Sequence, residues 1–214
     1  MPNILFFGDS LTAGFLAGGD ESKFRPPSRR VAARIRKRDG GGDGDSKGKK
    51  RRRKTEIQNE GEPGDTVQDA VRTGRLERVL ASARRRFTHV VILMATNDLR
   101  LGGETEAVVA GLGALYEACF AHGAAVLALT VPEIGFETPG LTERRTAVNE
   151  AIAALAASDE RRRCICVDVA SAMPQASLPE EERKKLWGDS VHCTIKGYSQ
   201  MGDLIFDALE ASGV

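Results

Sequence analysis

Three side chains near the two ends of the chain have the types and spacing of a nucleophilic serine site. Ser10 stands in the run Phe7-Gly8-Asp9-Ser10-Leu11, and Asp189 and His192 lie three residues apart in Trp187-Gly188-Asp189-Ser190-Val191-His192. Acyl transfer needs a hydroxyl, an imidazole that takes its proton and a carboxylate that orients the ring. Residues three apart on one turn share a side, so the Asp189 carboxylate is placed to accept from Nδ1 of His192 and leave Nε2 for Ser10.

Two further runs contain groups that would stabilise the oxyanion of such a reaction. Pro63-Gly64-Asp65-Thr66 offers the Gly64 N–H, and Thr96-Asn97-Asp98 offers the Asn97 amide. Each candidate, the serine and the histidine included, also has a plainer interpretation as a helix cap, a turn residue or a surface side chain. The catalytic interpretation therefore depends on whether these separated runs meet in space.

Five apolar runs alternate with helical patterns and predict the scaffold that would bring the candidates together. This alternation is typical of a parallel three-layer α/β/α sandwich, and right-handed crossovers favour the flavodoxin-like strand order 2-1-3-4-5. The carboxyl ends of such strands share one edge, where Ser10, Gly64 and Asn97 would meet. The expected strands are 3–7, 55–59, 88–94, 124–131 and 163–169, and the expected helices are 28–38, 66–86, 104–122, one capped by Thr142, and 194–211.

The candidate runs resemble, in order and across nearly the whole chain, the four sequence blocks of the SGNH or GDSL hydrolases. The resemblance implies Ser10 as nucleophile, His192 as general base and then acid, and Asp189 as the partner that orients the ring. It also implies an oxyanion hole made by the Ser10 N–H, the Gly64 N–H and the Asn97 side-chain amide. The matching runs are Gly8-Asp9-Ser10-Leu11, Pro63-Gly64-Asp65-Thr66, Thr96-Asn97-Asp98 and Asp189-Ser190-Val191-His192.

Two positions depart from the usual pattern of that family. Ala95 stands where a glycine usually precedes the Asn block, and Glu62-Pro63 replaces a smaller pair before Gly64. Both changes alter the backbone freedom next to the oxyanion donors. The Gly-x-Ser-x-Gly elbow of the α/β-hydrolases is absent from the sequence, which disfavours that superfamily.

The activity implied by the resemblance is that of a serine esterase, lipase or acylhydrolase. Such an enzyme would cleave small or lipid-like carboxylic esters through an acyl-enzyme intermediate, without a metal or other cofactor. A carbohydrate or lysophospholipid deacylase would use the same residues. The alternative from another class is a catalytically idle α/β module that binds a partner through a basic segment.

The cysteines favour neither disulfides nor a metal site. Cys119, Cys164, Cys166 and Cys193 are sparse and contain no Cys-x-x-Cys pair, which is typical of reduced thiols and argues against zinc. We expect Cys164 and Cys166 to point to opposite faces of their strand.

The net charge of +1 conceals an uneven distribution. Residues 29–54 carry 13 Lys and Arg against 3 Asp, a net of +10, so the remainder carries −9. Residues 39–54 have no side chain that could join a core, and we expect a disordered basic insertion within a single domain of residues 1–214. Its run Lys49-Lys50-Arg51-Arg52-Arg53-Lys54 is most simply a solvated loop, with nucleic-acid, nuclear-import or anionic-lipid binding as alternatives.

The hydropathy of the chain bears on its location. No apolar run approaches the roughly 20 residues of a membrane span, and the first apolar run does not look like a secretory leader. We therefore expect a cytoplasmic protein, with a nuclear location as the alternative that the basic run suggests.

Overall fold

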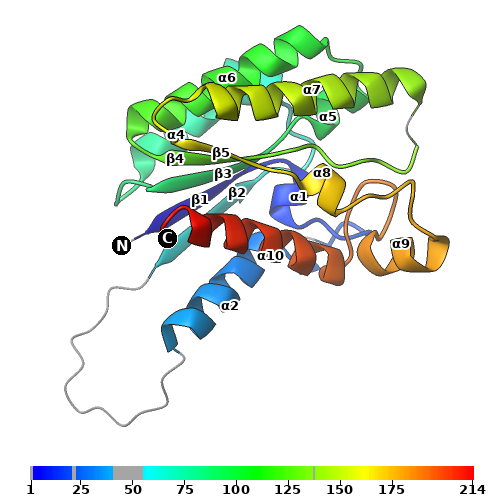
Figure 1. The fold of residues 1–214 in the computed structure, drawn as a ribbon, viewed down its shortest axis with the longest axis horizontal. Coiled ribbons are helices and arrows are strands. Elements are labelled where there is room, and N and C mark those ends of the chain that lie inside the picture. The colour runs from blue at the N-terminus through cyan, green and yellow to red at the C-terminus, as the bar shows by residue number, and fades with distance from the viewer. Residues whose placement is uncertain (1, 21–22, 41–54, 137) are drawn as a thin grey trace.

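A parallel β-sheet lies at the centre of the computed structural model, which describes residues 2–20, 23–40, 55–136 and 138–214 (Figure 1). Within these residues the sheet has five strands in the order β2-β1-β3-β4-β5, and every neighbouring pair is parallel. The predicted topology is therefore confirmed. The strands are β1 (Asn3–Gly8), β2 (Glu56–Gly61), β3 (His89–Leu93), β4 (Ala125–Leu129) and β5 (Cys164–Val167).

Helices cover both faces of this sheet and confirm the three-layer sandwich. They are α1 (Ser10–Ala13), α2 (Pro27–Gly40), α3 (Val67–Thr73), α4 (Arg75–Ser82), α5 (Thr96–Arg100), α6 (Thr105–His122), α7 (Pro139–Ser158), α8 (Val169–Ala172), α9 (Glu180–Leu186) and α10 (Ile195–Ala211). Figure 1 shows α2 and α10 on one face of the sheet and α6 and α7 on the other. Because side chains alternate along β1, Ile4 and Phe6 belong to the core cluster that includes α2 and α10, whereas Leu5 and Phe7 belong to the cluster that includes α3, α4, α6 and α7. Among the described residues, no helix is both long and apolar enough to cross a membrane.

The segment expected as one helix over residues 66–86 forms two helices, because Gly74 interrupts it. Gly74 has a left-handed φ of +63°, and its N–H donates to the carbonyls of Ala70 and Val71 at the end of α3. Glycine adopts this conformation without steric strain, which is why it commonly ends helices. Arg75 is consequently the first residue of a new helix, α4.

Several other boundaries differ from the predicted ones. Helix α7 begins at Pro139 and is capped by Thr138, not Thr142, because the Thr138 hydroxyl accepts from the Leu141 N–H. Helix α2 continues through Gly40, so residues 39–40 of the expected insertion are helical. Residues 41–54, including the basic run 49–54, lie outside the described part of the chain.

Cys164 and Cys166 share one face of β5. Both pack against the core cluster that β5 forms with α6 and α7, because residues two apart in a strand point the same way. The expectation of opposite faces was wrong. The four cysteine thiols are free in the structure.

Candidate active site

Ser10 lies at the carboxyl end of β1, where the chain turns into α1. Asp9 caps this turn, since its Oδ1 accepts a hydrogen bond of 2.9 Å from the Leu11 N–H. The Asp9 side chain is fully buried, and burial raises its pKa to about 7. The cap holds the first turn in place and so fixes Ser10 at the edge of the sheet where α/β folds bind their ligands.

The ring of His192 lies between Ser10 and Asp189. Nε2 is 3.0 Å from Ser10 Oγ, and Nδ1 is 2.9 Å from Asp189 Oδ2. A carboxylate can only accept hydrogen bonds, so the neutral ring carries its proton on Nδ1 and accepts from the serine hydroxyl at Nε2. The three side chains predicted from the sequence are therefore in direct contact.

The Asp189 carboxylate is held in its ionised form by the turn that carries His192. Burial raises the pKa of Asp189, but the hydrogen bonds of its carboxylate outweigh this and bring the pKa below the usual range. Two of these bonds come from the backbone N–H groups of Val191 and His192, each 2.7 Å from Oδ1. At neutral pH the carboxylate consequently orients the ring as an anion.

Gly64 follows β2 and Asn97 follows β3, the strands on either side of β1, and the two residues are joined through Asp65. Gly64 has a φ of +88° in a turn closed by the Asp65 N–H, which donates to the Glu62 carbonyl at 3.1 Å. A positive φ at this position is the signature of a type II turn, whose own hydrogen bond does not use the central Gly64 N–H. Asn97 Nδ2 donates to the Asp65 carbonyl at 2.9 Å, and the Glu62 N–H donates to the Gly8 carbonyl at 3.0 Å. The two predicted oxyanion donors are thus tied to each other and to the end of β1.

Ala95 adopts a conformation that favours glycine. Its φ of +86° lies in the left-handed region, directly before α5. This costs a residue with a side chain about 1–2 kcal/mol, whereas glycine reaches it without strain. The departure from the family pattern at this position therefore carries a local conformational cost next to Asn97.

Phe15 and Gln175 contact the triad although they lie outside the predicted runs. The Phe15 ring centroid is 4.5 Å from that of His192, and the Tyr198 hydroxyl donates to the Phe15 carbonyl at 2.8 Å. Gln175 is buried, and its Nε2 donates to the Asp189 carbonyl at 3.0 Å. No local motif marks either residue, because each contact forms only when distant loops return to the site.

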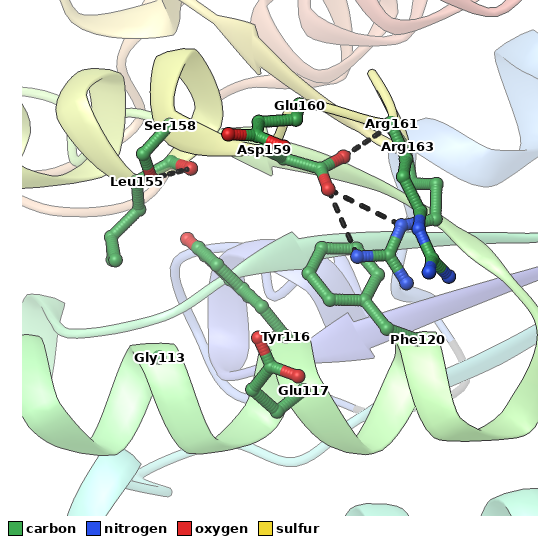
Figure 2. A pocket seen from close by; sticks show the side chains of 10 residues that line it. All are labelled: Gly113, Tyr116, Glu117, Phe120, Leu155, Ser158, Asp159, Glu160, Arg161 and Arg163. Carbon is green, nitrogen blue, oxygen red and sulfur yellow. Dashed lines mark hydrogen bonds and ion pairs between the residues drawn. The ribbon is translucent and has the colours of Figure 1, made fainter.

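A cavity lies at the edge of the sheet opposite to Ser10 (Figure 2). Among the described residues, no group of three or more His, Cys, Asp or Glu side chains is arranged to hold a metal ion. The cavity has a volume of about 590 Å³ and lies between α6, the end of α7 and the segment that leads into β5. Asp159 and Arg163 form an ion pair of 2.9 Å there, and the Arg163 guanidinium lies 4.0 Å from the ring centroid of Phe120. This cavity is at the amino ends of the strands, whereas Ser10 follows the carboxyl end of β1.

Comparison with known proteins identifies one matching family model and many solved structures with a similar fold. The model of the GDSL-like lipase/acylhydrolase family matches residues 6–200. The lipase/acylhydrolase from Enterococcus faecalis is 20% identical, with a TM-score of 0.71 over 99% of this chain and 97% of that chain. The psychrotrophic esterase EstA from Pseudoalteromonas sp., in a structure inhibited by monoethylphosphonate, is 18% identical, with a TM-score of 0.69 over 99% and 98%.

A mutant of Axe2, an acetyl-xylooligosaccharide esterase from Geobacillus, is also similar, with 18% identity and a TM-score of 0.69 over 96% of this chain and 93% of that chain. Comparison with curated proteins finds no match. At these identities the solved structures establish the fold, whereas the family match extends over most of the sequence. The chain therefore belongs to the GDSL-like lipase/acylhydrolase family.

Proposed function

We propose that the protein is a serine hydrolase that cleaves carboxylic esters through an acyl-enzyme intermediate. Its family is one of lipases and acylhydrolases, so ester hydrolysis is the general chemistry. The observation that carries the finer proposal is the 3.0 Å contact of Ser10 Oγ with His192 Nε2, with Asp189 on the other ring nitrogen. This geometry lets the imidazole take the serine proton as Oγ attacks a carbonyl carbon.

The reaction proceeds in two stages, and in each His192 first accepts a proton and then donates it. Attack by Ser10 forms a tetrahedral intermediate and places its proton on Nε2, and Asp189 stabilises the resulting imidazolium. The imidazolium then protonates the leaving alkoxide, which leaves the acyl group on Oγ. In the second stage His192 deprotonates a water molecule that attacks the acyl-enzyme, and the carboxylic acid and free serine are released.

The developing oxyanion would be stabilised by the backbone N–H groups of Ser10 and Gly64 and by the Asn97 side chain. Asn97 Nδ2 carries two protons, and the bond to the Asp65 carbonyl uses only one of them. The other proton remains for the oxyanion, and donors fixed in advance are the most effective kind.

Groups outside the triad determine which esters the site binds. Small or lipid-like esters are the primary proposal, and deacylation of a carbohydrate or lysophospholipid would use the same three side chains. Axe2, which shares the fold, acts on acetylated xylooligosaccharides. A panel of nitrophenyl esters of increasing acyl length, an acetylated sugar and a lysophospholipid separates these substrates, and an idle partner-binding module would turn over none of them.

Steady-state hydrolysis of p-nitrophenyl acetate tests the proposal. Ser10→Ala and His192→Ala should each lower kcat by about 10⁶, because the nucleophile and its base act as one unit. Ser82→Ala is the matched control, since Ser82 is exposed on α4 and its hydroxyl donates to the Val79 carbonyl. A Ser10→Ala variant that hydrolyses the ester within tenfold of the wild-type rate would contradict the mechanism.

A further inference from the structure

Arg75 is partly buried where the ends of β1 and β2 meet the turn that contains Gly64. Its side chain is only 12% exposed, and its guanidinium centre lies 3.9 Å from the ring centroid of Phe7. One terminal nitrogen donates to the Glu60 carbonyl at 2.9 Å, and the other donates to the Gly8 carbonyl at 3.0 Å. Arg75 therefore joins the carboxyl ends of two neighbouring strands, one of which leads directly to Ser10.

Asp65 connects Arg75 to the candidate oxyanion hole. Its carboxylate is 2.5 Å from the Arg75 guanidinium, while its backbone carbonyl accepts the 2.9 Å hydrogen bond from Asn97 Nδ2. Asp65 also directly follows Gly64 and closes the turn in which Gly64 lies. Burial raises the pKa of Asp65, and the charge of Arg75 opposes that rise. The ion pair of Arg75 with Asp65 thus contacts the residue that links the two predicted oxyanion donors, Gly64 and Asn97.

The stability of α4 does not explain the presence of Arg75. A cation in the first turn of a helix opposes the helix dipole, which favours anions there. The neighbouring Arg72, one turn earlier on α3, is largely exposed and pairs with Asp69 on the same helix. A buried ion pair is also weak evidence for stabilisation, since desolvation offsets most of its attraction. The contacts of Arg75 are instead directed to the strand ends that carry the site.

We propose that Arg75 is a positioning residue for the oxyanion hole and acts through Asp65. By fixing the Asp65 carbonyl it sets the direction of the Asn97 amide, and by holding the turn it sets the Gly64 N–H. This inference rests on the proposed function. Arg75 has no contact with Ser10 or His192 among the described hydrogen bonds and ion pairs, so its effect falls on transition-state stabilisation, that is, on kcat more than on KM.

The expected size of the effect follows from the sensitivity of catalysis to misplacement. A displacement of about 1 Å in a positioned group costs as much as 10² in rate. Arg75→Met should therefore lower kcat for p-nitrophenyl acetate by about 10- to 100-fold and change KM by less than about threefold. Arg75→Lys keeps a positive charge beside Asp65 but lacks the planar donors, so its kcat should lie between the two.

A double-mutant cycle with Asn97→Ala isolates the route through Asn97. Adding Arg75→Met to Asn97→Ala should lower kcat by a smaller factor than Arg75→Met does in the wild type, because the oriented amide is already gone and only the Gly64 N–H remains to be displaced. Arg163→Met is the matched control, since Arg163 also stacks on a phenylalanine and pairs with an aspartate, but at the opposite edge of the sheet. Its kcat should stay within twofold of wild type.

Three results would overturn the inference: a kcat of Arg75→Met within twofold of wild type, an equal loss with and without Asn97, or the same loss in Arg163→Met. If Arg75→Met does not fold, Arg75→Lys carries the test. A loss of threefold or more in Arg75→Lys that is smaller in the Asn97→Ala background supports the inference, and any other result contradicts it. Failure of the proposed function is separate, because it appears as activity that survives Ser10→Ala.

Discussion

Arg75 and Arg163 have the same kind of neighbours at opposite edges of the sheet but connect different parts of the chain. Each guanidinium lies over a phenylalanine ring, at 3.9 and 4.0 Å, and each pairs with an aspartate, at 2.5 and 2.9 Å. The Arg163 pair spans four residues and borders the cavity of Figure 2. The Arg75 contacts join β1, β2 and the turn that contains Gly64 and ends at Asp65, whose carbonyl accepts from Asn97. Similar side-chain chemistry therefore supports a local turn at one edge and the candidate site at the other.

At the carboxyl edge, Asn97→Ala should lower kcat by a larger factor than Arg75→Met. Removal of one oxyanion donor lowers kcat by about 10²–10³, because the transition-state charge loses a preorganised hydrogen bond. The measurement is kcat and KM for p-nitrophenyl acetate. Ser82→Ala is the control, since Ser82 is exposed. Asn149→Ala is unsuitable, because the Asn149 side chain accepts from the Val131 N–H and donates to the Val131 carbonyl. A kcat of Asn97→Ala within threefold of wild type would remove Asn97 from the oxyanion hole.

The two edges also differ in the direction in which their buried carboxylates titrate. Burial raises the pKa of Asp9 to about 7, so the native state holds a proton that the unfolded chain releases near 3.8. Stability should therefore fall as pH rises from about 4 to 7, by at most about 1.4 kcal/mol per pH unit for one proton. At the other edge, burial also raises the pKa of Asp159, but its hydrogen bonds to Arg163 and to the backbone outweigh this and lower it.

Asp9→Asn tests this difference, because asparagine can still accept from the Leu11 N–H but does not titrate. Urea unfolding between pH 4 and 7 should show a smaller decline in the variant than in the wild type. Asp159→Asn should behave in the opposite way, with a deficit that is present at neutral pH and fades as pH falls below about 4. A wild-type slope retained in Asp9→Asn would show that other groups cause the decline.

The smallest effect is expected for Arg163→Met. The stacking on Phe120 and the solvent-screened ion pair with Asp159 should together contribute little to the free energy of unfolding. Thermal unfolding should therefore shift slightly downward, while kcat stays within twofold of wild type. A large loss of activity in this variant would show that the two edges are coupled and would remove the contrast with Arg75.

The strand order and the contacts of the triad could be predicted because they depend on local patterns. Buried parallel strands have continuous apolar runs, their carboxyl ends share an edge, and Asp189 and His192 lie one turn apart. Two further assumptions are needed. Ser10 must reach that edge, which its place at the end of an apolar run indicates, and the segment with Asp189 and His192 must return to it, which the family resemblance implies.

The positioning contacts could not be predicted because they depend on where helices break and loops return. Without the interruption at Gly74, residues 66–86 form one continuous amphipathic pattern, in which Arg75 is simply one of several arginines. Gln175 reaches Asp189 from a loop whose path no periodicity determines. Hydrophobic periodicity identifies the faces of elements, but not which polar side chain will reach back to a particular carbonyl.

The central claim is that Ser10 is the nucleophile, and labelling by a fluorophosphonate followed by peptide mass spectrometry tests it most directly. The serine oxygen displaces fluoride only when His192 accepts its proton, so the wild type should carry one phosphonyl group on Ser10 and lose activity in proportion to labelling. His192→Ala should remain unlabelled over the same time. Labelling at another residue, or full activity in a protein labelled stoichiometrically at Ser10, would contradict the account.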